Sequence, residues 1–169
     1  MTVFEGYLII SIDDPYFHIN ISSRHRIFLR KFCASRRMAY SEEAIQYRPD
    51  PFRENVGLPF GIEGAYYVNN PDMDGEAMGT RLSAGVLDYH RPPQGQPSLF
   101  CGWTITRSRL IWSWNPEATA HIEWLRYLIR HFFSPWGYLL NGTLSWFNDV
   151  ADNAGDIVVA NNKITIRKY

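Results

Sequence analysis

The chain has 169 residues, a length that is typical of a single domain. Hydrophobic residues make up 46% of the chain and charged residues 20%, a composition that is typical of a globular protein and excludes a disordered one. Its seventeen basic and seventeen acidic residues cancel, which argues against general nucleic-acid binding. The N-terminus carries no signal-like pattern and no apolar run approaches membrane-spanning length, so we expect a cytoplasmic protein without a membrane segment.

The first part of the chain predicts a strand, a turn and a helix. Residues 4–12 (FEGYLIISI) are apolar and β-branched, and Asp13-Asp14-Pro15 is typical of a turn. Alternation over residues 17–22 suggests a short second strand. A helix then begins at Ser22 or Ser23 and runs to about Met38. The apolar side of that helix would consist of Ile27, Phe28, Leu29, Phe32 and Cys33.

The middle of the chain is dominated by breakers of regular structure. Proline and glycine punctuate residues 40–61, which predicts loop. Residues 63–69 (EGAYYVN) and 85–89 (GVLDY) look like strands, separated by an exposed polar segment at 70–85. Residues 91–97 (RPPQGQP), with three prolines, form a rigid loop.

Two strands and a second long helix follow. Residues 99–105 and 109–114 are predicted to be strands joined by a tight turn at Arg107-Ser108. A helix over residues 116–133 is then expected, with Asn115 as its N-cap and with Pro135-Trp136-Gly137 terminating it. Its buried face would hold Ile122, Leu125, Leu128, Ile129 and Phe132.

The last part of the chain predicts strands only. Residues 138–147 form one strand, and an acidic loop covers 148–155. Residues 156–160 and 163–168 form a hairpin whose turn, Asn161-Asn162, tolerates the positive φ that a tight turn requires. The order of elements indicates an α+β protein, with a mainly antiparallel sheet and both helices packed on one face of a single domain spanning residues 1–169. A ferredoxin-like core with added strands is one specific version.

Two residue classes are expected mainly in the core. Aromatic residues make up 15% of the chain, with six Trp, ten Tyr and ten Phe, and most of them should be buried. The two cysteines, Cys33 and Cys101, lie far apart and outside any CxxC pattern, so we expect two reduced, buried thiols.

The best cluster of functional groups is Asp88-Tyr89-His90-Arg91, at the end of a predicted strand beside the proline-rich loop. Polar groups held by a rigid loop and flanked by aromatic walls suit a small-ligand pocket. The alternative, which we favour, is that Asp88 and His90 satisfy backbone groups in a tight turn. The full predicted ligand-binding set is Asp88, Tyr89, His90, Arg91, Gln96, Trp103, Trp136 and Asn141.

Residues 24–37 (RHRIFLRKFCASRR) form the one strongly basic segment. Arg36 and Arg37 are its predicted anion-binding pair, while the simpler interpretation of the segment is the solvated face of a helix. Neither the His121–Glu123 pair nor the acidic run at 72–76 has the spacing of a metal site, and Glu123 with Arg126 is an ordinary ion pair on a solvent-exposed helix face. No catalytic or cofactor motif occurs. We therefore predict no metal, no cofactor and no catalytic residues.

Four segments together resemble a set of small uncharacterised proteins of phages, prophages, bacteria and other viruses. The resemblance spans residues 35–142, and the segments that carry it are, in chain order, Ser35-Arg36-Arg37-Met38, 64–68 (GAYYV), 88–103 (DYHRPPQGQPSLFCGW) and 123–142 (EWLRYLIRHFFSPWGYLLNG). The resemblance implies no established activity and so supplies no catalytic residues. Relatives tend to continue NGE-x-x-W with glutamine and acidic residues, where this chain has Thr143, Phe147 and Asn148.

These observations favour a non-enzymatic accessory protein of viral or mobile-element type that binds a small polar ligand, such as a nucleotide, in an aromatic-lined pocket. The alternative is an inhibitor or adaptor that contacts a host protein through exposed aromatic residues. A hydrolase using Asp88, His90 and Glu123 is least supported. Edges of the terminal hairpin would support a homodimer, although a covered edge would serve equally well.

Overall fold

The computed structural model describes residues 2–13, 19–34, 36, 39–41, 86–88, 90–92, 95–113, 118, 120–148 and 154–169. The chain divides into two compact units. The sheet unit comprises Met1–Ser22, Trp103–Ser113 and Ile122–Tyr169. The α1 unit comprises Ser23–Gly102 and Trp114–His121.

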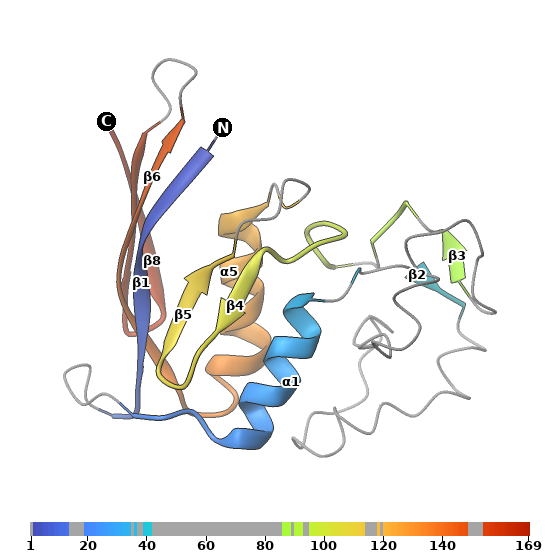
Figure 1. Cartoon of the computed structure of the whole chain (residues 1–169), viewed down its shortest axis with the longest axis horizontal. Helices are drawn as coiled ribbons and strands as arrows, with labels where there is room; N and C mark the ends of the chain where they lie inside the picture. Colours follow the sequence, from blue (N-terminus) through green and yellow to red (C-terminus); the bar gives the residue numbers. More distant parts are fainter. Residues whose placement is uncertain are drawn as a thin grey trace. The chain divides into compact units, whose positions relative to one another are not determined.

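The predicted α+β class is confirmed: the described residues form a six-stranded antiparallel sheet, two α-helices and a separate two-stranded ladder. Figure 1 shows their arrangement along the chain. The helices are α1 (Ser23–Ala34) and α5 (His121–Leu128). The sheet order is β4-β5-β1-β6-β7-β8. Its strands are β1 (Thr2–Ser11), β4 (Trp103–Ile105), β5 (Arg109–Trp112), β6 (Leu139–Asn148), β7 (Gly155–Ala160) and β8 (Lys163–Lys168).

The strand order is that of a ferredoxin-like core. Along the chain, β1 is followed by α1, by the two-stranded ladder and then by β4, and β5 lies between β1 and β4 in the sheet. In the same way β5 leads through α5 to β6, and β1 lies between them. This is the strand order of two overlapping split β-α-β patterns, to which β7 and β8 add an antiparallel hairpin. The prediction that both helices share one face concerns both units and stays a prediction.

The longest pairing in the sheet joins β1 to β6 over ten residue pairs, from Thr2↔Asn148 to Ser11↔Leu139. Side chains alternate across this pairing, as a strand requires. The core face carries the fully buried Leu8, Ile10, Leu140 and Leu144. The opposite face carries exposed side chains, including Tyr7 and Phe147. This alternation explains why both strands were predictable.

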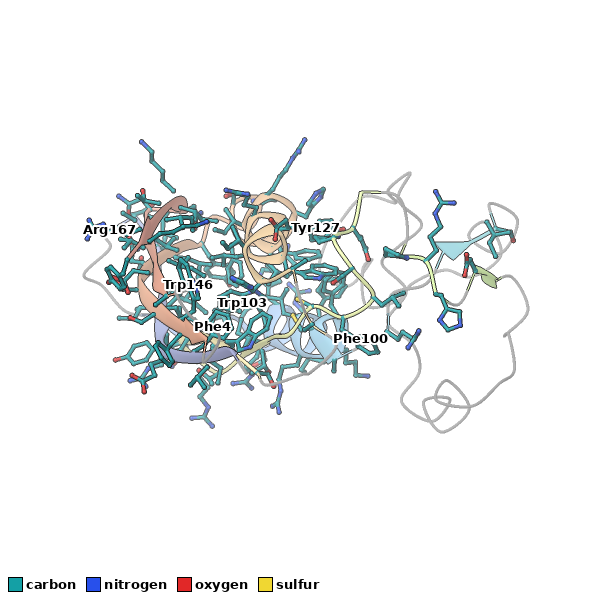
Figure 2. The ribbon with its side chains drawn as sticks, turned by 90° about the horizontal axis from the view of Figure 1, so that it is seen from above. Phe4, Phe100, Trp103, Tyr127, Trp146 and Arg167 are labelled. Atoms are coloured by element: carbon teal, nitrogen blue, oxygen red, sulfur yellow. The ribbon has the colours of Figure 1, made fainter. Side chains whose placement is uncertain are left out.

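Aromatic side chains fill the core face of the sheet unit beside these aliphatic residues (Figure 2). The rings of Phe4 and Trp112 have centroids 4.8 Å apart, and Trp103 meets Trp112 edge-on at 5.4 Å. Trp146 pairs with Phe4 across β1 and β6 and is buried. Offset and edge-on contacts of this kind add to the stabilisation from burial. The aromatic richness of the sequence therefore serves the core of this unit.

The second helix differs from its prediction. It begins at His121 and not at residue 116, and the predicted cap Asn115 and Pro116 lie outside the described residues. From Ile129 to Phe133 it continues as a wider π-helix, η2, which ends where the Ser134 N–H donates to the Ile129 carbonyl at 2.9 Å. The buried residues are Trp124, Leu125, Tyr127, Leu128, Ile129, Phe132 and Phe133. The predicted stop follows at Gly137, whose φ of +76° suits glycine.

Three other sequence predictions need correction. Residues 19–22 form no strand, because Ile19 N donates to the Ile10 carbonyl while Ile21 N donates to the Arg107 carbonyl, on two different segments. Helix α1 ends at Ala34 and not near Met38, and Ile27 on its predicted apolar side is 48% exposed. Strand β4 begins at Trp103 and not at residue 99. Predictions for residues 42–85 lie outside the described residues.

The carboxylate of Asp156 receives two hydrogen bonds on the exposed face of the terminal hairpin. Tyr169 donates its hydroxyl to Oδ2, and Ser145 donates Oγ to Oδ1 at 2.8 Å. These two bonds, that from Tyr169 foremost, lower the pKa of Asp156, and the same contact raises the pKa of Tyr169. Because the folded-state pKa of Asp156 is lowered, the bonds stabilise the fold above its unfolded pKa, and this contribution is lost as pH falls through the folded pKa.

We expect the Tyr169→Phe variant to raise the pKa of Asp156 toward its ordinary value, because the strongest donor to the carboxylate is removed. An NMR titration of the Asp156 carboxyl measures this directly. Ser145→Ala serves as the matched control and should produce a smaller rise. An unchanged Asp156 pKa in Tyr169→Phe would show that the hydroxyl does not hold the carboxylate.

Candidate functional site

Within the α1 unit, a two-stranded ladder positions two of the predicted site arginines. Strand β2 (Ala39–Tyr40) pairs antiparallel with β3 (Val86–Asp88), and Ala39 is opposite Asp88. Arg36 precedes Ala39 by three residues and Arg91 follows Asp88 by three, so both arginines leave the ladder at the same end. The sequence analysis predicted each arginine separately as a site residue. The register of the ladder adds that the two flank the same end of it.

The Arg36 guanidinium lies over an aromatic ring. Its central carbon is 5.3 Å from the centroid of Phe100, a half-buried residue of the loop that follows the prolines and is labelled in Figure 2. Cation–π attraction of this kind fixes the plane of a guanidinium over the ring. Phe100 was not predicted as a site residue, because nothing in the sequence relates it to residue 36.

The Asp88–Arg91 cluster forms an exposed turn. The His90 backbone N–H donates to Asp88 Oδ1 at 2.8 Å, which is the local bond that the turn interpretation predicted. The side chains of Asp88, His90 and Arg91 are all exposed. Tyr89 and Arg37, both predicted site residues, lie outside the described residues.

Two other predicted residues are buried, one in each unit. Gln96 is one of two buried polar residues in the described part of the chain. Trp103 is 1% exposed and packs against Trp112 in the core of the sheet unit. The Trp103 ring is therefore not exposed to a ligand in this structure, and its role is to pack in the core.

The predicted corner residues Trp136 and Asn141 both belong to the sheet unit. The half-buried Trp136 ring packs against Phe132 with centroids 5.5 Å apart. The Asn141 amide donates to Ser11 Oγ at 3.2 Å and accepts the Asn161 backbone N–H at 2.7 Å. Both ends of this amide are thus used within the fold, where they connect β6 to β1 and to the hairpin turn.

Helix α1 carries the rest of the basic segment. Arg24 and Arg30 are exposed, as the solvated-helix interpretation predicts, while Arg26 and Lys31 are half-buried. Partial burial, and then the charge of Arg24, lower the pKa of His25, so this imidazole is held more strongly in its neutral form. The cations of α1 add positive potential to the unit that contains Arg36.

The sheet unit has a second arginine–aromatic pair, which the sequence analysis missed. The Arg109 guanidinium carbon lies 4.1 Å from the centroid of the exposed Tyr7 ring. Arg109 is opposite Ile9 in the β1–β5 pairing, which puts it diagonal to Tyr7 on the outer face. The signal needed to find this pair was the register between strands about a hundred residues apart, which sequence alone does not supply.

In the described part of the chain no group of three or more His, Cys, Asp or Glu side chains could hold a metal ion. No helix among these residues is long and apolar enough to cross a membrane. Comparison of the chain with protein-family models, with curated proteins and with solved structures finds no match.

Proposed function

We propose that the protein is a non-enzymatic binding protein, an accessory factor of viral or mobile-element type, that captures a small ligand of the nucleotide class. One observation supports this most: the β2–β3 ladder leads Arg36 and Arg91 away from the same end, with Arg36 stacked on Phe100. The viral or mobile-element assignment rests on the sequence resemblance described above.

The chemistry of these residues suits a ligand that combines an anionic group with a planar ring. Guanidinium forks match phosphate oxygens and make charge-assisted hydrogen bonds of about 1.5–3 kcal/mol each. The Phe100 ring and the guanidinium plane of Arg36 offer surfaces on which a base stacks. Asp88 and His90, exposed in the adjoining turn, add polar groups for a sugar.

Arg36→Ala and Arg91→Ala are each expected to weaken nucleotide binding about 10- to 100-fold, because each removes one charge-assisted contact. Calorimetric titration with ribonucleoside monophosphates, and with inorganic phosphate alone, measures the effect. Arg126→Ala is the matched control, since it removes one exposed arginine from α5 in the sheet unit. If wild type binds and all three variants bind equally well, the ligand lies elsewhere.

A second candidate function, inhibition or adaptation through contact with a host protein, is favoured by one surface. Val3 and Phe147 are paired neighbours on the outer face of β1 and β6, and Phe147 is 58% exposed. Exposed aromatic side chains are common anchors of protein interfaces. A stoichiometric partner that co-purifies with wild type and is lost in Phe147→Ser would support this alternative over nucleotide capture.

A further inference from the structure

The two cysteines of the chain, 68 positions apart, meet inside the α1 unit. The Sγ atoms of Cys33 and Cys101 are 3.7 Å apart, and both side chains are buried and reduced. Cys33 lies in the last turn of α1, and Cys101 lies in the irregular segment just before β4. No sequence pattern related the two residues, since neither belongs to a CxxC motif.

The separation of the sulfurs is that of two atoms in van der Waals contact. A disulfide bond is about 2.05 Å long, so the sulfurs would have to approach by only about 1.6 Å. Small rotations about the Cys side-chain torsions supply a shift of this size, and Cys101 lies outside regular structure, where the backbone adjusts readily. With this adjustment, formation of the bond requires an oxidant.

We propose that Cys33 and Cys101 are a redox modification site that closes into a reversible intramolecular disulfide. Cys33 is 7% exposed and Cys101 is 0% exposed, so Cys33 is the thiol that an oxidant reaches first. With oxidised glutathione, the Cys33 thiolate attacks the glutathione disulfide and releases one reduced glutathione. The Cys101 thiolate then attacks the Cys33 sulfur and releases the second. One disulfide forms, one is reduced, and the two protein thiols lose their protons.

Closing this bond ties the end of α1 to the segment that enters β4. The closed loop contains Arg36, the β2–β3 ladder and the Asp88–Gln96 segment, so the disulfide would restrain every element of the candidate ligand site in the α1 unit. A cross-link over a loop of this length restricts the unfolded chain and raises thermal stability. The disulfide rests on sulfur geometry alone and does not depend on the proposed nucleotide binding.

The test is oxidation of the folded full-length chain with oxidised glutathione, followed by alkylation in denaturant and intact-mass measurement. We expect a monomer that has lost two hydrogen atoms and carries no alkyl group, with a melting temperature raised by about 5–10 °C. Dithiothreitol should restore two alkylatable thiols and the original melting temperature. Cys33→Ser and Cys101→Ser each retain one thiol and should show no oxidation-dependent shift.

Three results would overturn the proposal: two alkylated thiols in oxidised wild type, stable glutathione adducts on both cysteines, or a disulfide found only between chains. The mass measurement reads the bond itself, so it decides the question even if either serine variant folds poorly. Nucleotide binding is not used as a readout, which keeps this outcome separate from that of the proposed function.

Discussion

Replacing Gly6 with alanine is expected to destabilise the fold by at least about 3 kcal/mol, because it combines backbone strain with a steric overlap. Gly6 lies in the middle of β1 at a φ of +108°, a region that L-residues rarely occupy. A Cβ atom there would overlap the carbonyl oxygen of Thr143 on the paired strand β6. The obstacle is backbone within the ten-pair β1–β6 ladder, so it cannot move aside without breaking the pairing.

Gly142 repeats this arrangement from the other strand. Its φ is +139°, and a Cβ atom would lie 2.7 Å from the Tyr7 carbonyl oxygen. Gly6 pairs with Leu144 and Gly142 with Leu8, so the two strands approach closely at two diagonal positions. Glycine at both positions therefore permits the central pairing of the sheet.

Urea denaturation of Gly6→Ala, compared with Gly137→Ala, separates strain from overlap. Gly137 also has a positive φ, +76°, but a Cβ atom there would meet nothing within 4 Å. We expect Gly137→Ala to cost only about 1–2 kcal/mol, the price of the backbone conformation alone. Equal destabilisation by the two substitutions would contradict the close approach of β1 and β6.

Asn162→Ala is expected to cost about 2–4 kcal/mol, because one side chain secures the hairpin turn to the start of β6. Its Oδ1 accepts the Leu140 backbone N–H at 2.7 Å, and its Nδ2 donates to the Tyr138 carbonyl at 2.8 Å and to Ser134 Oγ at 3.1 Å. Leu140 is fully buried, so alanine at position 162 would leave a backbone N–H in the interior without this acceptor.

The neighbouring Asn161 provides the control for this substitution. Both asparagines have positive φ, 48° at Asn161 and 67° at Asn162, so alanine is strained at either. Asn161 is bonded to Asn141 through its backbone N–H, which alanine retains. Asn161→Ala should therefore cost about 1 kcal/mol, the strain alone. If thermal melts show equal losses for the two variants, the Asn162 amide does not secure the turn.

Local patterns predicted the elements of the sheet well. Strands β1 and β6 and the Asn161-Asn162 turn depend on patterns among neighbouring residues, and the two strands and the turn occur where predicted. Helix ends were less predictable, because tertiary partners decide them. Helix α1 ends at Ala34, and Ala39 pairs with the distant Asp88, a contact that the helical periodicity of the sequence does not encode.

The candidate site was predictable only in pieces. Arg36 and Arg91 were each singled out by charge and context, whereas the register that relates them and the ring of Phe100 depend on contacts between distant segments. Trp103 is the opposite case: its aromatic ring and its place close to the proline-rich loop suited a pocket wall, but the side chain is buried in the core of the sheet unit. The Cys33–Cys101 pair likewise became visible only when the folded chain brought the sulfurs together.

The central claim, capture of a small nucleotide-class ligand, is tested most directly by native mass spectrometry of wild-type protein purified from cells. The account predicts a species heavier than the 19.7 kDa chain by one discrete small-molecule increment, which is lost on denaturation and less abundant in Arg36→Ala. A bare chain in the native spectrum, together with no heat of binding for any ribonucleoside monophosphate, would contradict it.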